Sequence, residues 1–372
     1  EGARILAEHL EAAGARVQID DATFRARNYA RLLMPLGVVG LFANRLVRRG
    51  KRIRGSLLAA AVTALTIDDA ENGRRPWRRL VAPEQATQNV VAEVGDPDAE
   101  RTLVVLAHHD AAPTGLFFDQ GFQRNLAKRF PDLVAARDEA LPIWYPTIAG
   151  PVLTILAGLL RLPVAGLGRL LSLVAVVFGI DVARHRIVPG ANDNLSACGA
   201  LVALAERLRD VKGIRVVLAS CGAEEVLQGG IYGFVEQHLR PLDPKKTWVV
   251  NLDTIGSPEL ILVEGEGPFF VHRFDRQLCD LVDRAGGGVR RGCIARASTD
   301  GIIPSRAGYP TALLCSWEPD TKLMTNYHLM TDTPEHLRYE TIERAVDVVD
   351  GVAREIATAG QANAQLADSR SR

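Results

Sequence analysis

The stretch Thr102-Leu-Val-Val-Leu-Ala-His-His-Asp110 decides the fold that we expect for this chain. Its apolar, β-branched residues predict a strand that is buried on both faces, as in the middle of a parallel sheet. Side chains alternate between the two faces of a strand, so His108 and Asp110 share one side and His109 points away. This spacing suits a metal-bound imidazole whose second nitrogen is held by a carboxylate.

Two other apolar runs also lead to acidic residues. Residues 214–219 lead toward the pair Glu224-Glu225, and residues 247–252 lead into Asp253. The carboxyl ends of strands in an open α/β sheet line the crevice where ligands bind, so we expect these donors to converge on one rim. Adjacent carboxylates on a turn can diverge, so that one binds a metal while the other is a general base. The alternative for this pair is a solvated surface turn.

Two more candidate ligands lie in loops. Asp193 precedes a helix predicted over 196–208, and backbone N–H groups there can fix its carboxylate with both oxygens facing outward. A carboxylate that bridges two metal ions needs that orientation. His328 lies just before a long helix predicted over 334–356. Taken singly, Asp193 is a helix cap and His328 a surface histidine, and only the complete set predicts a two-metal site.

The composition is that of a folded protein with a substantial core. Of the 372 residues 47% are hydrophobic, and 44 Lys and Arg residues balance 44 Asp and Glu residues. A net charge near zero gives no support for a nucleic-acid partner. The chain begins at Glu1, so a preceding signal peptide cannot be judged. The odd number of cysteines, without C-x-x-C spacing, argues against a disulfide framework and predicts buried thiols: Cys198, Cys221, Cys279, Cys293 and Cys315.

These patterns predict an α/β fold, a three-layer sandwich with a central mixed, mostly parallel β-sheet flanked by helices, plus inserted apolar helical hairpins. The polar, small-residue end of the chain is expected to be disordered. The expected parts are an α/β domain at 1–29, 71–113 and 188–358, an apolar helical hairpin at 30–70, a second apolar helical segment at 114–187, and a disordered tail at 359–372.

The two insertions are more apolar than ordinary loops. The first has a cluster of arginines between two apolar stretches, and from 141 to 180 the only charged residues are Arg161 and Arg169. A membrane-spanning helix needs roughly 20 apolar residues, whereas apolar hairpins with basic tips suit a shallow anchor whose arginines meet anionic head groups. We therefore expect a membrane-associated protein, with membrane contact through 30–70 and 141–180. The alternatives are a soluble four-helix cap and a homo-oligomer interface.

In their order and local sequence, the motifs resemble the co-catalytic zinc aminopeptidase family. That family includes bacterial and vacuolar aminopeptidases, glutamate carboxypeptidase ectodomains and, more distantly, glutaminyl cyclases. The resemblance covers the regions around 1–25, 86–112 and 188–358 and rests on five separated motifs. It implies two divalent metal ions, Zn²⁺, as cofactors.

The resemblance also implies the metal ligands. His108 and Asp253 would hold one ion, and Glu225 and His328 would hold the other. Asp193 would bridge the two ions with its carboxylate oxygens.

The same resemblance implies the residues that act around the ions. Glu224 would be the general base, and Asp110 would orient His108. Tyr327 would help to stabilise the oxyanion. Asp300 is expected near the site but not in it.

The activity implied by the family is the hydrolysis of an amide bond that releases an N-terminal residue from a peptide or aminoacyl substrate. One alternative is a glutaminyl-cyclase-like aminoacyl cyclotransferase, which works with one ion. Another is a non-catalytic, peptidase-like membrane ectodomain. The complete set of ligands disfavours both. The chain departs from the family in the long insertion between its first two motifs, and in Ala197 and Val226, where glycine is usual.

Overall fold

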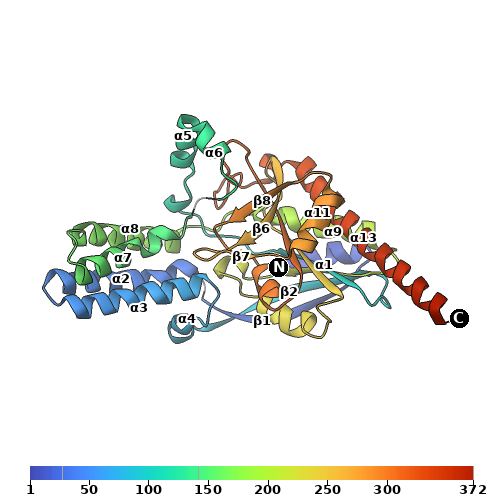
Figure 1. The fold of residues 1–372 in the computed structure, drawn as a ribbon, viewed down its shortest axis with the longest axis horizontal. Helices are drawn as coiled ribbons and strands as arrows, with labels where there is room; N and C mark the ends of the chain where they lie inside the picture. Colours follow the sequence, from blue (N-terminus) through green and yellow to red (C-terminus); the bar gives the residue numbers. More distant parts are fainter. Residues whose placement is uncertain (27, 141, 372) are drawn as a thin grey trace.

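A computed structural model gives the fold of residues 1–26, 28–140 and 142–371, with side chains through residue 359. Its centre is one sheet of nine strands in the order β1-β2-β4-β3-β5-β9-β6-β7, with β8 paired to β6 (Figure 1). The strands are β1 (Arg16–Arg25), β2 (Glu84–Gly95), β3 (Thr102–His108), β4 (Arg215–Cys221), β5 (Thr247–Leu252), β6 (Glu259–Glu266), β7 (His272–Arg273), β8 (Arg290–Ala295) and β9 (Thr311–Trp317).

The strands at the centre of the sheet run parallel. β3 lies between β4 and β5, and β5 pairs in parallel with β9. The pairs β1-β2, β2-β4, β6-β7 and β6-β9 are antiparallel. All seven residues of β3 are buried, which is why its sequence is a continuous apolar run. The mixed α/β sheet expected from the sequence is confirmed, and its parallel pairs lie at the centre and between β6 and β8.

Helices cover both faces of the sheet and complete a three-layer sandwich. Leu103 and Val105 of β3 pack in one core with the first helical layer, and Val104 and Leu106 pack in a second core with the other layer. The five cysteines are buried and free, as the sequence predicts. The first layer consists of α1 (Gly2–Ala12), α9 (Ser196–Leu208), α11 (Arg276–Gly286) and α13 (Tyr339–Ser371), and the second includes α10 (Ile231–Phe234) and α12 (Ile302–Arg306).

The two apolar insertions pack together as one four-helix bundle that projects from the sandwich, at the left of Figure 1. Each helix pair contacts the other, since α2 packs on α8 and α3 packs on α7. The bundle consists of α2 (Tyr29–Arg48), α3 (Arg52–Ala70), α7 (Tyr145–Leu159) and α8 (Ala165–Arg184), and the connections to the sandwich carry α4 (Pro76–Val81), α5 (Gly121–Arg129) and α6 (Pro131–Ala135).

Mostly small side chains, together with Leu36 and several valines, fill the interior of the bundle, and many large apolar side chains are exposed. Asn44, which is fully buried, donates through Nδ2 to Thr154 Oγ1 and to the Ala165 carbonyl, both at 2.9 Å. This arrangement is the reverse of an ordinary surface helix, whose large apolar residues face the core. The buried residues of α7 are Gly150, Pro151, Thr154, Ala157 and Gly158. Side chains of the bundle that are 54–70% exposed include Phe42, Ile53, Leu57, Leu170 and Val177.

The C-terminal helix differs from the expectation. The sequence predicts a disordered tail at 359–372, but α13 continues through Ser371. Alanine and glutamine recur along the end of the chain, and both residues favour helix formation. The small, polar composition that predicts disorder is therefore also compatible with a continued helix.

Candidate metal centre

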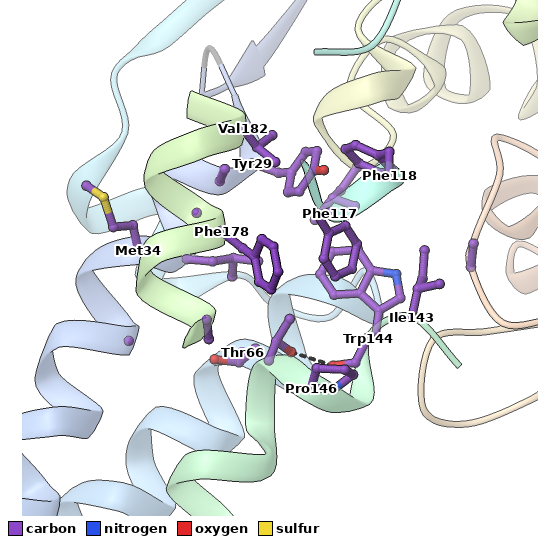
Figure 2. Close-up of a pocket in the computed structure, with 18 of the residues that line it drawn as sticks. Tyr29, Met34, Thr66, Phe117, Phe118, Ile143, Trp144, Pro146, Phe178 and Val182 are labelled. Carbon is purple, nitrogen blue, oxygen red and sulfur yellow. Dashed lines mark hydrogen bonds between the residues drawn. The ribbon is translucent and has the colours of Figure 1, made fainter. Parts of the chain in front are cut away.

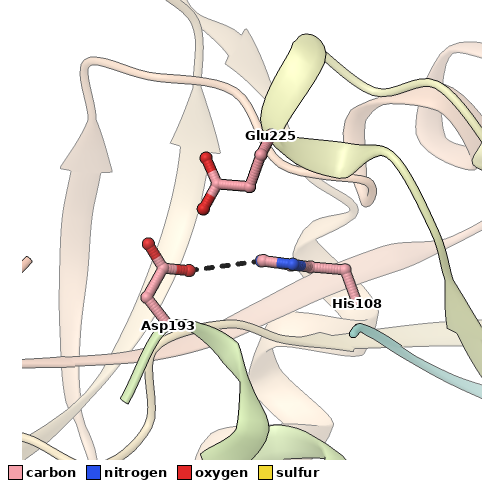
Figure 3. Close-up of side chains that lie close together, drawn as sticks. All are labelled: His108, Asp193 and Glu225. Carbon is pink, nitrogen blue, oxygen red and sulfur yellow. Dashed lines mark ion pairs between the residues drawn. The ribbon is translucent and has the colours of Figure 1, made fainter. Parts of the chain in front are cut away.

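The C-terminal end of β3 brings His108 to the rim of the sheet where other candidate ligands gather. His108 Nε2 lies 3.2 Å from Asp193 Oδ1 and 3.8 Å from Asp253 Oδ2. One donor atom each of His108, Asp193 and Glu225 lie within 4.8 Å of one another, and Figure 3 shows these side chains directed at a common point. Residues that are far apart in the sequence therefore meet in one site.

Asp193 is at the centre of this site because its two carboxylate oxygens face different histidines. Oδ1 faces His108, while Oδ2 lies 3.3 Å from His328 Nε2. His328 Nε2 in turn lies 3.4 Å from Glu225 Oε2. The candidate ligands thus form two groups, His108 with Asp253 and His328 with Glu225, and Asp193 lies between the groups. This is the grouping that the sequence resemblance implies.

Asp110 connects β3 to the loop of the glutamate pair. Its Oδ1 lies 3.5 Å from His108 Nδ1, which also lies 3.1 Å from the Asp110 carbonyl oxygen. The same carboxylate accepts hydrogen bonds from the backbone N–H groups of Glu224, at 2.9 Å, and Glu225, at 3.0 Å. Asp110 therefore contacts the imidazole and also fixes the turn η3 (Glu224–Val226). The sequence predicted only the first of these roles.

A carboxylate that sequence reasoning missed fixes the Asp193 turn, η2 (Ala191–Leu195). Asp332 accepts hydrogen bonds from the backbone N–H groups of Asn192, at 2.8 Å, and Asp193, at 3.2 Å. A cis peptide bond joins Asp193 to Asn194. The available sequence signal was an acidic residue four positions after His328, in the same loop.

Gln228 holds the side chain of Glu224. Its Nε2 donates to Glu224 Oε1 and to the Ser298 carbonyl, both at 2.7 Å. Its Oε1 accepts from Asn72 Nδ2 at 2.7 Å, so the amide is fixed from both ends. Glu224 Oε2 lies 3.9 Å from His108 Nε2 and thus faces the ligand cluster. No sequence signal distinguished Gln228 from a surface glutamine.

Two buried arginines attach the root of the bundle to the loop of the glutamate pair. Arg78 forms a bidentate ion pair with Asp69 of α3, with Nε–Oδ1 at 3.0 Å and Nη2–Oδ2 at 2.9 Å. Arg78 also donates to the Val226 carbonyl at 2.6 Å, and Arg75 donates to the Leu227 carbonyl at 2.7 Å. Leu227 has a φ of 67°, a strained value for a residue with a side chain. These donors hold the strained loop in place.

Aromatic rings enclose His328. The Tyr327 ring stacks on it with centroids 3.9 Å apart, and the Phe118 ring lies 4.2 Å away by the same measure. Burial, with the nearby carboxylates, raises the pKa of Tyr327 well above its usual value, so the phenol stays protonated. Asp300, expected near the site, is buried and close enough to Glu224 for its charge to contribute to the raised pKa of that carboxyl.

Buried carboxylates that repel one another dominate the electrostatics of the site. Burial and neighbouring carboxylates raise the pKa values of Glu224 and Glu225 well above the usual range. Burial likewise raises the pKa of Asp253 to about 6. Burial acts in the same direction on Asp193, but the nearby imidazoles of His108 and His328 outweigh it and lower that pKa. A cluster of this kind favours the binding of cations.

The donor atoms fit divalent metal ions. Glu225 Oε1 and both ring nitrogens of His328 are buried without a hydrogen-bond partner among the described residues. A buried polar atom without a partner costs about 1–3 kcal/mol, and a coordinated ion would remove that cost. Imidazole nitrogens and carboxylate oxygens are ordinary ligands of Zn²⁺.

An α/β sandwich with imidazoles and carboxylates clustered at the carboxyl ends of its strands is typical of a metal-dependent hydrolase. The model of Peptidase family M28 matches residues 177–353. The resemblance to the co-catalytic zinc peptidases that we inferred from the sequence is thereby confirmed. His108 and Asp110 lie outside the matched segment, and the fold brings them to the residues within it. No curated protein matches the chain significantly.

Solved structures share the fold. A glutaminyl cyclase of Bacteroides thetaiotaomicron, bound to N-acetylhistamine, aligns with a TM-score of 0.53 and 15% identity over 94% of this chain and 87% of its own. A leucine aminopeptidase precursor from the same species aligns with a TM-score of 0.52 and 14% identity over 94% and 86%. A Zn-dependent exopeptidase from Parabacteroides distasonis aligns with a TM-score of 0.50 and 14% identity, over 94% of this chain and 87% of its own. At 14–15% identity these structures show that the fold is shared, and the family match adds the resemblance of residues 177–353 to zinc peptidases.

Proposed function

We propose that the protein is an aminopeptidase in which two zinc ions and Glu224 act on the amide bond of an N-terminal residue. One observation carries the proposal: the two oxygens of Asp193 face His108 on one side and His328 on the other. A carboxylate in that position is suited to bridge two ions. His108 and Asp253 would complete one metal site, and His328 and Glu225 the other.

Glu224 is suited to be the general base. Its Oε1 is held by Gln228, so Oε2 is the oxygen that accepts a proton from the attacking water. When bound, the ions would make that water more acidic and polarise the substrate carbonyl. The water oxygen then adds to the carbonyl carbon, the C–N bond breaks, and Glu224 passes the proton to the leaving nitrogen. Tyr327, beside His328, is suited to donate a hydrogen bond to the oxyanion.

The Glu224→Gln variant tests this assignment. Gln keeps the shape of the side chain but cannot accept the proton, so we expect kcat on aminoacyl anilides to fall by about 10²–10⁴-fold. The zinc content, measured by elemental analysis, should stay unchanged. Glu236→Gln, at an exposed position, is the matched control and should keep full activity. Activity of Glu224→Gln within a few-fold of the unmodified protein would refute the role.

The cyclase alternative makes a different prediction about metal content and product. A glutaminyl-cyclase-like enzyme would hold one ion per chain and convert an N-terminal glutamine into a ring without cutting the peptide. Two ions per chain and release of a free N-terminal residue would support the aminopeptidase. At 15% identity the cyclase structure shares the fold with this chain, and this likeness does not decide between the activities.

We also propose that the four-helix bundle enters an anionic membrane. The outward position of its large apolar side chains and its small-residue interior support this, because helices in lipid pack closely through small residues. α2 and α8 are each 20 residues long and apolar enough to cross a membrane by length and composition. A helix of that length extends about 30 Å, the thickness of the hydrocarbon core. The basic turn between α2 and α3 is suited to anionic head groups.

Vesicle flotation of the full chain tests the membrane proposal. We expect the purified protein to need detergent and to float with vesicles that contain phosphatidylglycerol. Vesicles of phosphatidylcholine alone should retain less protein, because the basic turn loses its partner. A protein that is monodisperse without detergent and does not float would contradict the proposal, and a detergent-free dimer would identify the bundle as a protein interface.

A further inference from the structure

A cavity of about 250 Å³ extends from the metal centre into the root of the bundle. Glu224, Glu225 and His328 line one end. All four bundle helices contribute to the other end, where Met34 comes from α2, Thr66 from α3, Thr147 from α7 and Phe178 from α8. The bundle is therefore part of the wall of the site as well as a projection from the sandwich.

The lining of this cavity is apolar and aromatic. Figure 2 shows the rings of Tyr29, Phe117, Trp144 and Phe178 gathered around its middle, and Phe117 packs edge-on against Phe178 with centroids 5.8 Å apart. Among the described residues of the lining, the charged side chains are the two glutamates at the metal end. A polar peptide chain would leave its amide groups without partners in such a space. A hydrocarbon chain would gain by burial there.

The size and the position of the cavity also favour a chain over a single ring. An apolar cavity of roughly 150 Å³ holds benzene, so 250 Å³ exceeds the needs of one phenyl group. Val174 of α8 lines the cavity and is 38% exposed. Its neighbours on α8, Leu170, Leu173 and Val177, are 46–55% exposed, so the apolar surface of this helix adjoins the wall of the cavity.

We infer that the substrate is an amphiphilic amide, with its scissile bond at the metal centre and a long hydrocarbon chain in the cavity. This inference rests on the proposed hydrolase function and adds the class of substrate. Water adds across the amide, the acyl C–N bond breaks, and a carboxylate and an amine are released. The hydrocarbon chain stays on one of these two products and is not altered.

Two series of synthetic amides test the inference with the full chain in detergent. In one series the N-terminal amino acid carries an alkyl side chain from methyl to decyl, and in the other an alanyl amide carries the same alkyl groups on its nitrogen. In one series we expect kcat/KM to rise about fourfold per methylene, the equivalent of about 0.8 kcal/mol, until the cavity is full. No gain with chain length in either series would overturn the inference.

Binding separates this inference from the proposed activity. The same amides are titrated calorimetrically into the zinc-loaded Glu224→Gln variant, where no turnover is needed. Affinity that rises with chain length supports the hydrocarbon cavity even if the unmodified protein hydrolyses none of the amides, in which case only the aminopeptidase proposal fails. Affinity that is independent of chain length overturns the cavity inference, whatever the activity on the methyl compounds.

A pair of variants on α8 locates the chain. Ala175→Phe places a ring in the cavity, and Val177→Phe places the same ring on the outer surface, where Val177 is 55% exposed. We expect Ala175→Phe to lower the ratio of decyl to methyl affinity by about tenfold or more, and Val177→Phe to leave it unchanged. If Ala175→Phe does not fold, Val174→Trp, at another position of the cavity lining, replaces it in this test. Equal ratios in all these proteins would refute the location.

Discussion

Asp110 has two tasks at the metal centre, because one carboxylate contacts an imidazole and two backbone N–H groups. Its Oδ1 lies 3.5 Å from His108 Nδ1, and its two oxygens hold the turn that carries Glu224 and Glu225. The two proposed metal sites are therefore connected through a residue that we do not place among the candidate ligands. Partners behind a ligand typically alter metal affinity by 10- to 100-fold.

We predict that Asp110→Asn binds zinc about 10- to 100-fold more weakly, because the neutral amide loses the charge beside His108 and one of its two acceptor oxygens. Competition with a zinc-chelating dye measures the affinity. His109→Gln is the control, since His109 faces away and contacts Ser220 Oγ at 2.9 Å. Unchanged zinc affinity in Asp110→Asn would show that the metal sites do not depend on this carboxylate.

Glu266 gives a pH-dependent prediction. Burial raises its pKa from 4.5 to about 8, although Thr299 donates to it. The folded chain thus holds this proton more tightly than the unfolded chain, so the contribution of Glu266 to stability decreases as the pH rises from 4.5 to about 8. From about pH 5 to pH 9, the free energy of unfolding should therefore fall less in Glu266→Gln than in the unmodified protein. The two decreases should differ by at most about 4 kcal/mol. Denaturant unfolding at both pH values measures this, and parallel pH profiles would contradict it.

At the residue scale, the candidate ligands could be proposed from the sequence, but the residues that support them could not. His108 and Asp253 stand at the ends of apolar runs, which is a signal that one sequence can display. Asp332 contacts Asn192 and Gln228 contacts Ser298, both far away in the sequence. The residues around Asp332 and Gln228 in the sequence do not predict these contacts. Side chains of this kind become visible only when the fold brings their partners together.

At the scale of elements, the ion pair between Arg78 and Asp69 joins the end of α3 to the loop of the glutamate pair. Both side chains are buried, and Arg78 also donates to the Val226 carbonyl. The last turn of a bundle helix thus supports the position of the candidate catalytic loop. The bundle, which projects from the sandwich, is therefore connected to the site through these side-chain contacts.

We predict that Asp69→Asn destabilises the protein by about 3–5 kcal/mol, because it leaves the buried Arg78 guanidinium without its counter-charge. The loop carbonyls held by Arg78 should then be less fixed, so kcat should also fall. Denaturant unfolding and kinetics on the same sample measure the two effects. Asp210→Asn, whose side chain is 87% exposed, is the control. An unaltered unfolding midpoint in Asp69→Asn would count against this role.

Helices and strands with a strong hydrophobic periodicity were predicted well, but the elements that they pack against were not. The helix expected over 196–208 is observed at Ser196–Leu208, and the strand expected over 247–252 at Thr247–Leu252. The helix expected from 334 begins at Tyr339, because residues Pro334–His336 form a separate short turn, η5. The two apolar hairpins associate because small residues let their helices pack closely. This packing cannot be predicted from the periodicity of the sequence.

At the scale of the whole molecule, the metal centre holds together segments from most of the chain. Its candidate ligands come from β3, from η2, from η3, from the end of β5 and from the loop before α13. Their carboxylates are buried and repel one another, as the raised pKa values of Glu224 and Glu225 indicate. Ions bound there would therefore stabilise the packing of the entire sandwich.

We predict that removal of metal by a chelator lowers the Tm by roughly 5–10 °C, since ligands bound at 1,000 times their Kd add about 4 kcal/mol. Added Zn²⁺ should restore the Tm, and scanning calorimetry measures both changes. In His328→Ala, which lacks one ligand candidate, the chelator should have a smaller effect. A chelator that leaves the Tm of the unmodified protein unchanged would contradict a structural contribution of the ions.

The attachment of Arg75 and Arg78 to the carbonyls of Leu227 and Val226 has a consequence for enzymology. These hydrogen bonds connect the root of the bundle to the candidate catalytic loop, so we expect a tilt of the helices to shift the glutamate pair relative to the imidazoles. If lipid surrounds the bundle, acyl-chain length in the bilayer becomes a variable of turnover, alongside temperature and pH. A comparison of turnover rates in bilayers of short-chain and long-chain lipids would then report on the tilt of the helices.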